Sequence, residues 1–212
     1  MLEQTIIYAV IMLICFPVHE CAHAFAAYKL GDDTAYRMGR LTLNPLKHLD
    51  LFGSVLMLAT GFGWAKPVPI NPMNFKNRKV GFALSALAGP ASNLILAYIF
   101  MIIYRIANHI RPEHLNEVGM VIMQVFVTGV TINVMLAVFN LIPVPPLDGS
   151  RIFSLILPEK TYFRMMNYER ISFVILIALS FLPVFRVFMS FFNNLVIDAI
   201  MFLTNWLGIF GI

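Results

Sequence analysis

Charged residues are scarce in this sequence. Asp, Glu, Lys and Arg make up 12% of its 212 residues, whereas hydrophobic residues make up 59%. Ordinary globular domains carry about 25% charged residues, so this composition excludes a soluble globular protein. Several apolar windows approach the roughly 20 residues that a helix needs to cross a bilayer. The composition therefore predicts an integral, multi-pass membrane protein.

Cysteine is also rare, and basic residues are missing at the start. Cys15 and Cys21 are the two cysteines, and their separation of six residues does not place them on one helix face. A disulfide framework is therefore excluded. The first apolar segment has no basic residue before it, and Glu3 is the only charge ahead of Glu20. Because a signal peptide begins with a basic region, we expect this segment to be a retained span.

The apolar windows predict an all-α polytopic membrane protein that forms one domain, 1–212. A shorter window at 51–62, in a stretch with glycines at 53, 61 and 63, leads into Pro67, Pro69 and Pro72. Proline cannot donate a backbone hydrogen bond, so we expect a small re-entrant or β-hairpin element at about 51–75. Besides this element, the long windows predict five to six transmembrane helices. The long windows are 4–28, 81–104, 118–142, 171–190 and 192–212.

The basic residues predict an orientation in the membrane. Of the fifteen Lys and Arg residues, eight lie at 29–80 and four at 143–170. Since basic residues favour the cytoplasmic side, we expect both connections in the cytoplasm and the N-terminus outside. No soluble basic face is visible, which argues against nucleic acid as a partner.

One short stretch carries most of the chemical information. His19-Glu20-Cys21-Ala22-His23 has the pattern H-E-x-x-H. On a helix, positions i and i+4 share a face, so both imidazoles can bind one zinc ion while the glutamate reaches a metal-bound water. The alternative is a pair of buried, hydrogen-bonded histidines. That alternative leaves a glutamate in an apolar helix unexplained, because a buried charge is costly without a partner.

A catalytic zinc ion needs a third protein ligand and an open position. Asp148 differs from the other acidic residues because Pro143, Pro145 and Pro146 interrupt the helix before it. We expect it on irregular backbone at a helix mouth, at the level of His23. The alternative role is that of a cap for the next helix. Asp50 and Asp198 are the candidates that remain if Asp148 is not a ligand.

Three segments resemble the site-2 protease family of intramembrane zinc metalloproteases. They are H-E-x-x-H, "AGPASN" at 88–93, which is similar to G-P-x-x-N, and "NLIPVPPLDG", which is similar to N-x-x-P-x-P-x-L-D-G. The resemblance covers about 1–155, the expected catalytic core, and leaves the C-terminal helices at about 171–212 without a motif. Within this family, the chain looks closest to compact prokaryotic members without a PDZ domain.

The resemblance implies a role for each matching residue. His19, His23 and Asp148 would bind one Zn²⁺ per chain, and Glu20 would be the general base. Asn140 would contact the substrate or the oxyanion, for which a side-chain amide is a suitable donor. An interhelical hydrogen bond is the alternative role for Asn140.

Two further sets of residues have alternative roles that stay open. Asn93 matches the asparagine of G-P-x-x-N, but packing is an equal possibility because Gly89 and Ala91 allow helices to approach closely. His48 and Asp50, in "LNPLKHLDLFG", either touch a metal or order their loop, and we favour loop ordering.

The predicted function is cleavage of transmembrane segments by zinc-activated water. The expected partners are a transmembrane protein or peptide substrate and membrane lipid, and the expected location is the cell membrane, with the active site open to the cytoplasm. A transmembrane helix hides its peptide bonds, so the extended segment at 64–72 is expected to hold an unwound substrate by strand addition. The alternative is a zinc-binding transporter or scaffold without proteolysis. Transporters usually show internal repeats, and this sequence has none.

Overall fold

The computed structural model describes residues 2–50, 52–53, 65–110, 117–158, 160–161, 164 and 167–210. Within these ranges the chain is mostly helical and contains no β-strand, only an isolated antiparallel bridge between Leu49 and Ala65. The predicted all-α class is therefore confirmed.

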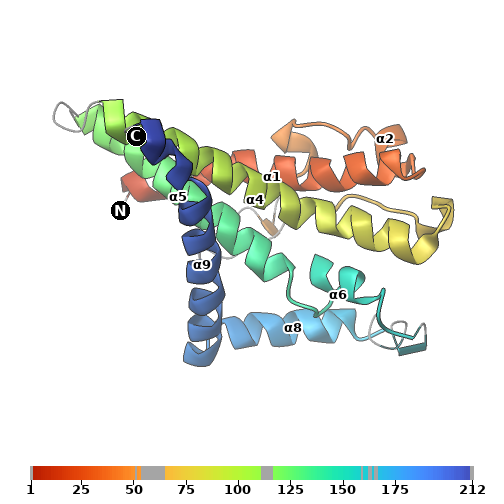
Figure 1. The fold of residues 1–212 in the computed structure, drawn as a ribbon. Coiled ribbons are helices and arrows are strands. Elements are labelled where there is room, and N and C mark those ends of the chain that lie inside the picture. The colour runs from red at the N-terminus through yellow and green to blue at the C-terminus, as the bar shows by residue number, and fades with distance from the viewer. Residues whose placement is uncertain are drawn as a thin grey trace.

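Three long helices form the centre of the molecule (Figure 1). They are α1 (Leu2–Lys29), α4 (Arg78–Ile110) and α5 (Glu117–Asn140). Buried Ile7, Ile11 and Cys15 of α1 pack against Ile132 of α5, and Leu96 of α4 lies against the same cluster. This packing joins the three helices along their apolar faces, and it fixes the positions from which the polar residues of the site project.

Four of the described helices are long and apolar enough to cross a membrane. By length and composition they are Glu3–Lys29, Arg78–His109, Glu117–Asn140 and Pro183–Gly208. A multi-pass membrane protein is thus supported, whereas the expected count of five to six helices is not confirmed.

The C-terminal windows of the sequence have the wrong boundaries. The window 171–190 is not one helix, because α8 (Glu169–Ser180) has only 12 residues and α9 (Pro183–Leu203) starts afresh. Leu182 has extended backbone and Pro183 takes the first position of α9, where its missing N–H costs nothing. Hydropathy alone could not show this break, since apolar residues continue across it. α9 runs across α5 in Figure 1, and η3 (Asn205–Phe210) follows it.

The connection between α1 and α4 contains short elements and an extended piece. α2 (Thr34–Arg37) and η1 (Pro45–Lys47) precede the bridge, and η2 (Pro72–Asn74) follows it. Residues 66–71 have no helical structure, in agreement with the expected extended segment. About half of the predicted hairpin falls at 51 and 54–64, outside the described residues, so the hairpin stays a prediction.

A short helix carries the last of the candidate ligands. After α5, residues 141–147 form turns and bends, and α6 (Asp148–Phe153) begins at Asp148 itself. Irregular backbone therefore leads up to Asp148, as expected, but the residue lies on the first turn of a helix. α6 lies between α4 and α8 in Figure 1, and Asp148 in its first turn contacts His19 and His23 of α1.

Candidate metal centre

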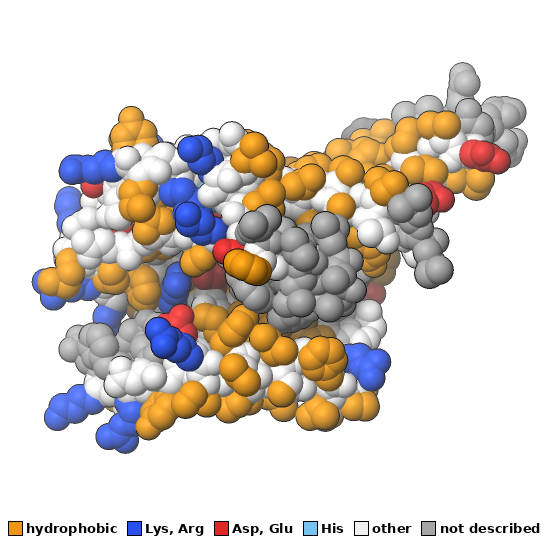
Figure 2. All heavy atoms as spheres, turned by 180° about the vertical axis from the view of Figure 1, so that it is seen from behind, with side chains coloured by type: hydrophobic (Ala, Val, Ile, Leu, Met, Phe, Trp, Pro, Cys, Tyr) orange, Lys and Arg blue, Asp and Glu red, His pale blue; other side chains and the backbone are white. Residues whose placement is uncertain are grey.

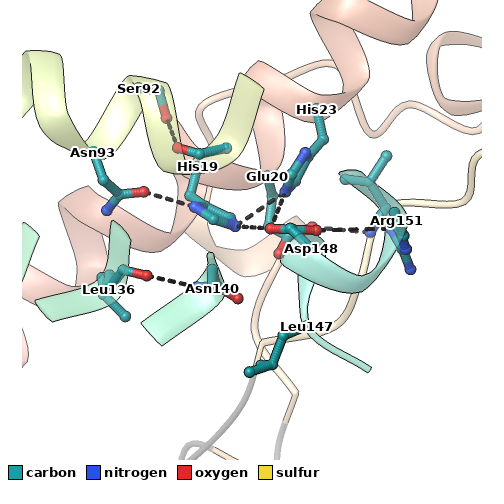
Figure 3. Close-up of polar contacts among 12 residues, drawn as sticks. His19, Glu20, His23, Ser92, Asn93, Leu136, Asn140, Leu147, Asp148 and Arg151 are labelled. Carbon is teal, nitrogen blue, oxygen red and sulfur yellow. Dashed lines mark hydrogen bonds and ion pairs between the residues drawn. The ribbon is translucent and has the colours of Figure 1, made fainter. Parts of the chain in front are cut away.

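His19, His23 and Asp148 meet at one point (Figure 3). His19 and His23 project from the same face of α1, as their spacing predicts, and Asp148 reaches them from α6. The Nε2 atoms of His19 and His23 are 3.0 Å apart. Oδ2 of Asp148 lies 3.2 Å from Nε2 of His19 and 3.1 Å from Nε2 of His23. All three side chains are buried. The structure thus brings together the three residues that the sequence singled out as ligands.

The spacing of these atoms fits a zinc ion. Zinc binds nitrogen and oxygen at about 2.0–2.2 Å, which places neighbouring ligand atoms of a tetrahedron about 3.3 Å apart. The observed separations of 3.0–3.2 Å are close to that value. Two imidazoles and one carboxylate also make a donor set typical of catalytic zinc, with one position left open. The residues therefore fit the ion that the sequence implies.

Both imidazoles have a partner on the ring nitrogen that faces away from the centre. Nδ1 of His19 lies 2.6 Å from Oδ1 of Asn93, and Nδ1 of His23 lies 2.7 Å from the carbonyl oxygen of Ser85. A carbonyl oxygen only accepts, so each Nδ1 must donate its proton. The lone pair of each Nε2 is then directed toward the metal position. Asn93 therefore has a part in the site beyond the helix packing that its sequence motif also allowed.

Gly89 makes room for these imidazoles. A Cβ atom at this position would collide with the rings of both His19 and His23. The absence of a side chain lets α4 approach α1 at the level of the site, which places Asn93 and Ser85 beside the histidines. The expectation that Gly89 allows close helix approach is confirmed, and the rings of the two ligands are what fill the space.

Glu20 lies beside the three ligands and has a different partner. Its Oε2 accepts a hydrogen bond of 2.9 Å from the backbone N–H of Val68, in the extended segment after the bridge. The carboxylate is buried and lines the same cavity as the ligands. A carboxylate held in place at the cavity wall is well positioned to exchange protons with a water or substrate there.

The environment of Asp148 favours its ionised form. Arg151, one turn later on α6, lies 3.8 Å from the other carboxylate oxygen. The deprotonated form is the one that binds a metal.

Asn140 ends α5 at the edge of the same cavity. Its Nδ2 donates a 2.9 Å hydrogen bond to the carbonyl oxygen of Leu136 in its own helix. The bond seen is therefore within α5, and not the interhelical bond that we considered as an alternative. One N–H of the amide is not used in this bond, because a side-chain amide has two.

A cavity of about 740 Å³ opens from the metal centre. Its walls come from α1, the extended segment after Ala65, α5, α6, α8 and α9. The lining is largely apolar, and it includes Phe16, Val68, Ile70, Phe139, Phe173 and Phe185. The C-terminal helices, which carried no recognisable motif, thus form one side of the space in front of the site.

Two residues of uncertain role lie outside this centre. His48 is fully buried and its Nε2 lies 2.8 Å from the carbonyl oxygen of Thr42, while Asp50 accepts a 2.8 Å hydrogen bond from the N–H of Gly53. Neither joins the His19, His23 and Asp148 group found among the described residues, and Asp198 does not either. Loop ordering, the favoured role for His48 and Asp50, is confirmed by these bonds.

Sequence reasoning missed three contributors to the site. Ser85 and Val68 act through backbone atoms, which leave no trace in residue type. Asn133 of α5 is fully buried and hydrogen-bonded to Asn93. An amide in the middle of an apolar helix is the signal that could have identified Asn133, because such groups are expensive in a membrane without a partner.

Comparisons with known proteins agree with this centre. The model of peptidase family M50 matches residues 105–183. A Bacillus subtilis protein named "Putative zinc metalloprotease YwhC" is 44% identical over 172 residues, which is 81% of this chain and 78% of the relative. "Putative zinc metalloprotease Rip2" of Mycolicibacterium smegmatis is 31% identical over 82% of this chain and 65% of the relative. "Putative zinc metalloprotease MJ0611" of Methanocaldococcus jannaschii is 28% identical over 65% of this chain and 63% of the relative. No solved structure gives a significant match.

Proposed function

Because the chain belongs to peptidase family M50, the site-2 protease family, and is a zinc metalloprotease, we propose that it cuts peptide bonds within transmembrane segments of membrane-bound substrates. The observation that carries this proposal is the buried group of His19, His23 and Asp148 at the wall of a largely apolar cavity. Such a site is placed to receive an apolar chain from the membrane and to act on it away from bulk water.

Each residue of the centre has a role in this proposal. His19, His23 and Asp148 hold one zinc ion, which when bound would act as a Lewis acid and lower the pKa of a water. Glu20 takes the proton from the attacking water and then delivers it to the amine that leaves. The amide of Val68 supports this role, because it holds the Glu20 carboxylate at the cavity wall.

Asn140 is proposed to stabilise the oxyanion that forms on the scissile carbonyl. Its position on the cavity wall and the N–H that does not bond to Leu136 support this role. A preorganised amide donor of this kind contributes more in a buried site than in water.

The extended segment at 65–71 is proposed to bind the unwound substrate. Ala65, Pro67, Val68 and Ile70 line the cavity, so the segment runs along the path that a substrate would take. A substrate strand that pairs with this backbone would expose its peptide bonds next to the metal centre. Val68 is already bonded to Glu20 through its N–H, so the pairing must use the other backbone groups of the segment.

We place the N-terminus outside and the active site toward the cytoplasm. Figure 2 shows Lys and Arg side chains gathered at one end of the molecule, the end that carries α2 and α6 in Figure 1. Positively charged ends face the cytoplasm in membrane proteins. His23 lies in the last third of α1, which leads to α2, and Asp148 begins α6. Membrane lipid would surround the apolar helices that extend away from this end.

Proteolysis by purified protein is the direct test. The detergent-solubilised chain is incubated with a panel of single-span membrane proteins, with a zinc chelator in one arm and with chelator followed by excess zinc in another. We expect cleavage inside the apolar segment of a substrate, its loss with chelator and its return with zinc. Stoichiometric zinc binding without cleavage of any substrate in the panel, and none in cells that co-express them, would contradict the proposal.

A further inference from the structure

Two buried asparagines connect the metal centre to the middle of the helix bundle. Asn93 of α4 and Asn133 of α5 are 1% and 0% exposed. Nδ2 of Asn93 donates a 3.0 Å hydrogen bond to Oδ1 of Asn133, and Oδ1 of Asn93 faces Nδ1 of His19. Asn133 in turn donates a 2.7 Å hydrogen bond from Nδ2 to the carbonyl oxygen of Gly129, and also contacts Sγ of Cys15 at 3.0 Å.

These bonds have only one direction that satisfies every group. The carbonyl oxygen of Gly129 accepts and never donates, so the NH₂ end of Asn133 must face it. The oxygen of Asn133 then faces Asn93 and needs a donor, which is the NH₂ end of Asn93. The oxygen of Asn93 is therefore directed at His19, whose Nδ1 must carry the proton. His19 is left with a lone pair on Nε2, the atom that faces His23 and Asp148.

His23 does not depend on such a chain. Its Nδ1 bonds to the backbone carbonyl of Ser85, which has a fixed polarity. An asparagine side chain, in contrast, can rotate by half a turn and present NH₂ where its oxygen was. If Asn93 did so, it would donate to Nδ1 of His19 and place the ring proton on Nε2, where it blocks the metal. Something must hold Asn93 in the correct orientation.

We propose that Asn133 is a positioning residue that, by fixing the orientation of Asn93, holds His19 in the tautomer that binds metal. The inference rests on the proposed function in one respect, since it requires His19 to be a zinc ligand. An asparagine that served only to join α4 and α5 would stabilise the helices, but its effect on metal binding would not depend on the residue at position 93.

The test measures zinc affinity of the purified full chain by competition with a chelator, together with the visible spectrum of its Co²⁺ form. Groups behind metal ligands typically contribute a factor of 10–100 to affinity. We expect Asn133→Leu, which has no acceptor for Asn93, to weaken zinc binding about tenfold and to alter the Co²⁺ spectrum. Asn133→Asp keeps an acceptor oxygen facing Asn93, so its zinc affinity should be closer to that of the parent than to that of Asn133→Leu.

The residue at position 93 provides the decisive comparison. A carboxylate in Asn93→Asp has two acceptor oxygens, so it presents an acceptor to His19 whichever way it rotates. In this background we expect Asn133→Leu to change zinc affinity by less than about twofold. Thr131→Val is the matched control, because Thr131 also bonds to the carbonyl four residues earlier in α5 but is exposed. It should leave zinc affinity unchanged.

The outcomes separate this inference from the ligand assignment. The inference is wrong if Asn133→Leu leaves zinc affinity unchanged in the chain that has Asn93. It is also wrong if Asn133→Leu weakens zinc binding by the same factor in that chain and in the Asn93→Asp variant. If His19→Ala also keeps the parent affinity, the proposed ligand set has failed as well. Should Asn133→Leu not fold, Asn133→Ser replaces it, because a serine hydroxyl can bond to its own helix but is too short to reach Asn93.

Discussion

The carboxylate of Glu20 lies beside the metal centre without being part of it. Three atoms of His19, His23 and Asp148 lie within hydrogen-bonding distance of one another, whereas Glu20 bonds to the amide of Val68. Binding of a metal and transfer of a proton are thus assigned to different side chains. At the scale of single residues, this separation predicts that metal content and cleavage rate respond to different substitutions.

Glu20→Gln should keep close to one zinc per chain and lose cleavage. Glutamine retains an oxygen that accepts from the N–H of Val68, but it cannot take a proton from water. Metal analysis and a cleavage assay on the same preparation check this. Full activity of the variant would mean that another group is the base.

Asp148→Ala should lower both bound zinc and cleavage, because it removes one of three ligands. Asn140→Ala should leave zinc in place and reduce the rate by about 10²–10³ at most, the usual effect of one oxyanion donor. Zinc titration and cleavage rates of both variants provide the check. Normal zinc affinity of Asp148→Ala would mean that Asp148 is not a zinc ligand.

Three backbone N–H groups of the extended segment after the bridge bond to other parts of the chain, one of them to the site. The N–H of Lys66 donates to the carbonyl of His48, that of Val68 to Glu20, and that of Asn71 to Asp32. The side chain of Arg40 also donates to the carbonyl of Lys66. At the scale of elements, the segment is therefore a wall of the cavity with defined inner contacts, and its remaining backbone groups are those available to a substrate.

Ile70→Pro should slow cleavage of transmembrane substrates and leave zinc content unchanged. Among the described residues none accepts a hydrogen bond from the N–H of Ile70, so proline removes a donor without breaking a bond seen in the structure. Val68→Pro is a different experiment, since it also deprives Glu20 of its partner. Cleavage rates are compared with those of Lys76→Pro, at an exposed position outside the segment. If Ile70→Pro cleaves at the parent rate, the substrate is held elsewhere.

Asp32 anchors the far end of this segment, and Asp32→Ala should destabilise the protein. The carboxylate is fully buried and accepts from the backbone of Thr34 and Asn71 and from the side chain of Asn74. Loss of the acceptor removes these partly buried hydrogen bonds, each of which contributes about 0.5–1.5 kcal/mol to stability. A lowered thermal midpoint in detergent is the measurement. Asp33→Ala is the control, because its ion pair with Arg37 is exposed and contributes little.

The same carboxylate predicts a dependence of stability on pH. Burial by itself raises the pKa of Asp32, but the hydrogen bonds from Thr34, Asn71 and Asn74 outweigh it and lower the pKa. A group whose pKa is lower in the folded state stabilises the protein above the unfolded pKa of about 3.9, and this contribution is lost as the pH falls through the folded value. The difference in thermal midpoint between the parent and Asp32→Ala should therefore shrink below about pH 4. A constant difference would contradict this account.

At the scale of the whole molecule, the basic side chains and the elements that carry the metal centre lie at the same end. The basic side chains gather at the end with α2 and α6 (Figures 1 and 2). His23 lies in the last third of α1, which leads to α2, and Asp148 begins α6. α4 ends and α5 begins at the opposite end, where the N-terminus also lies (Figure 1). If the basic end is cytoplasmic, the cut is made toward the cytoplasmic side of the membrane.

Labelling of single cysteines in cells tests this orientation. In a chain with Cys15 and Cys21 replaced by alanine, Lys76→Cys should react with an impermeant reagent only after the membrane is opened. Glu117→Cys, at the start of α5, should react from outside in intact cells. Both positions are exposed in the structure. The reverse pattern would leave the metal centre as it is but reverse the side from which it acts.

The sequence by itself determined the features that depend on local spacing. Membrane character followed from the scarcity of charge, and a shared face for His19 and His23 followed from the helical period, because both are properties of one continuous segment. Asp148 was singled out by the prolines before it and then by the resemblance to a family, Asn140 by the resemblance alone, and both line the cavity. The C-terminal boundaries were wrong, since an apolar window does not show where one helix stops and the next begins at Pro183.

Only the tertiary structure decided which distant groups meet. Asn93 is 74 residues from His19, Ser85 is 62 from His23, and Val68 is 48 from Glu20. These contacts depend on how α1, α4, α5 and the extended segment pack, and two of them use backbone atoms that any residue would supply. Residue spacing can place two ligands on one helix, but the partners that fix their tautomers and hold the base are set by the approach of other elements, which Gly89 permits.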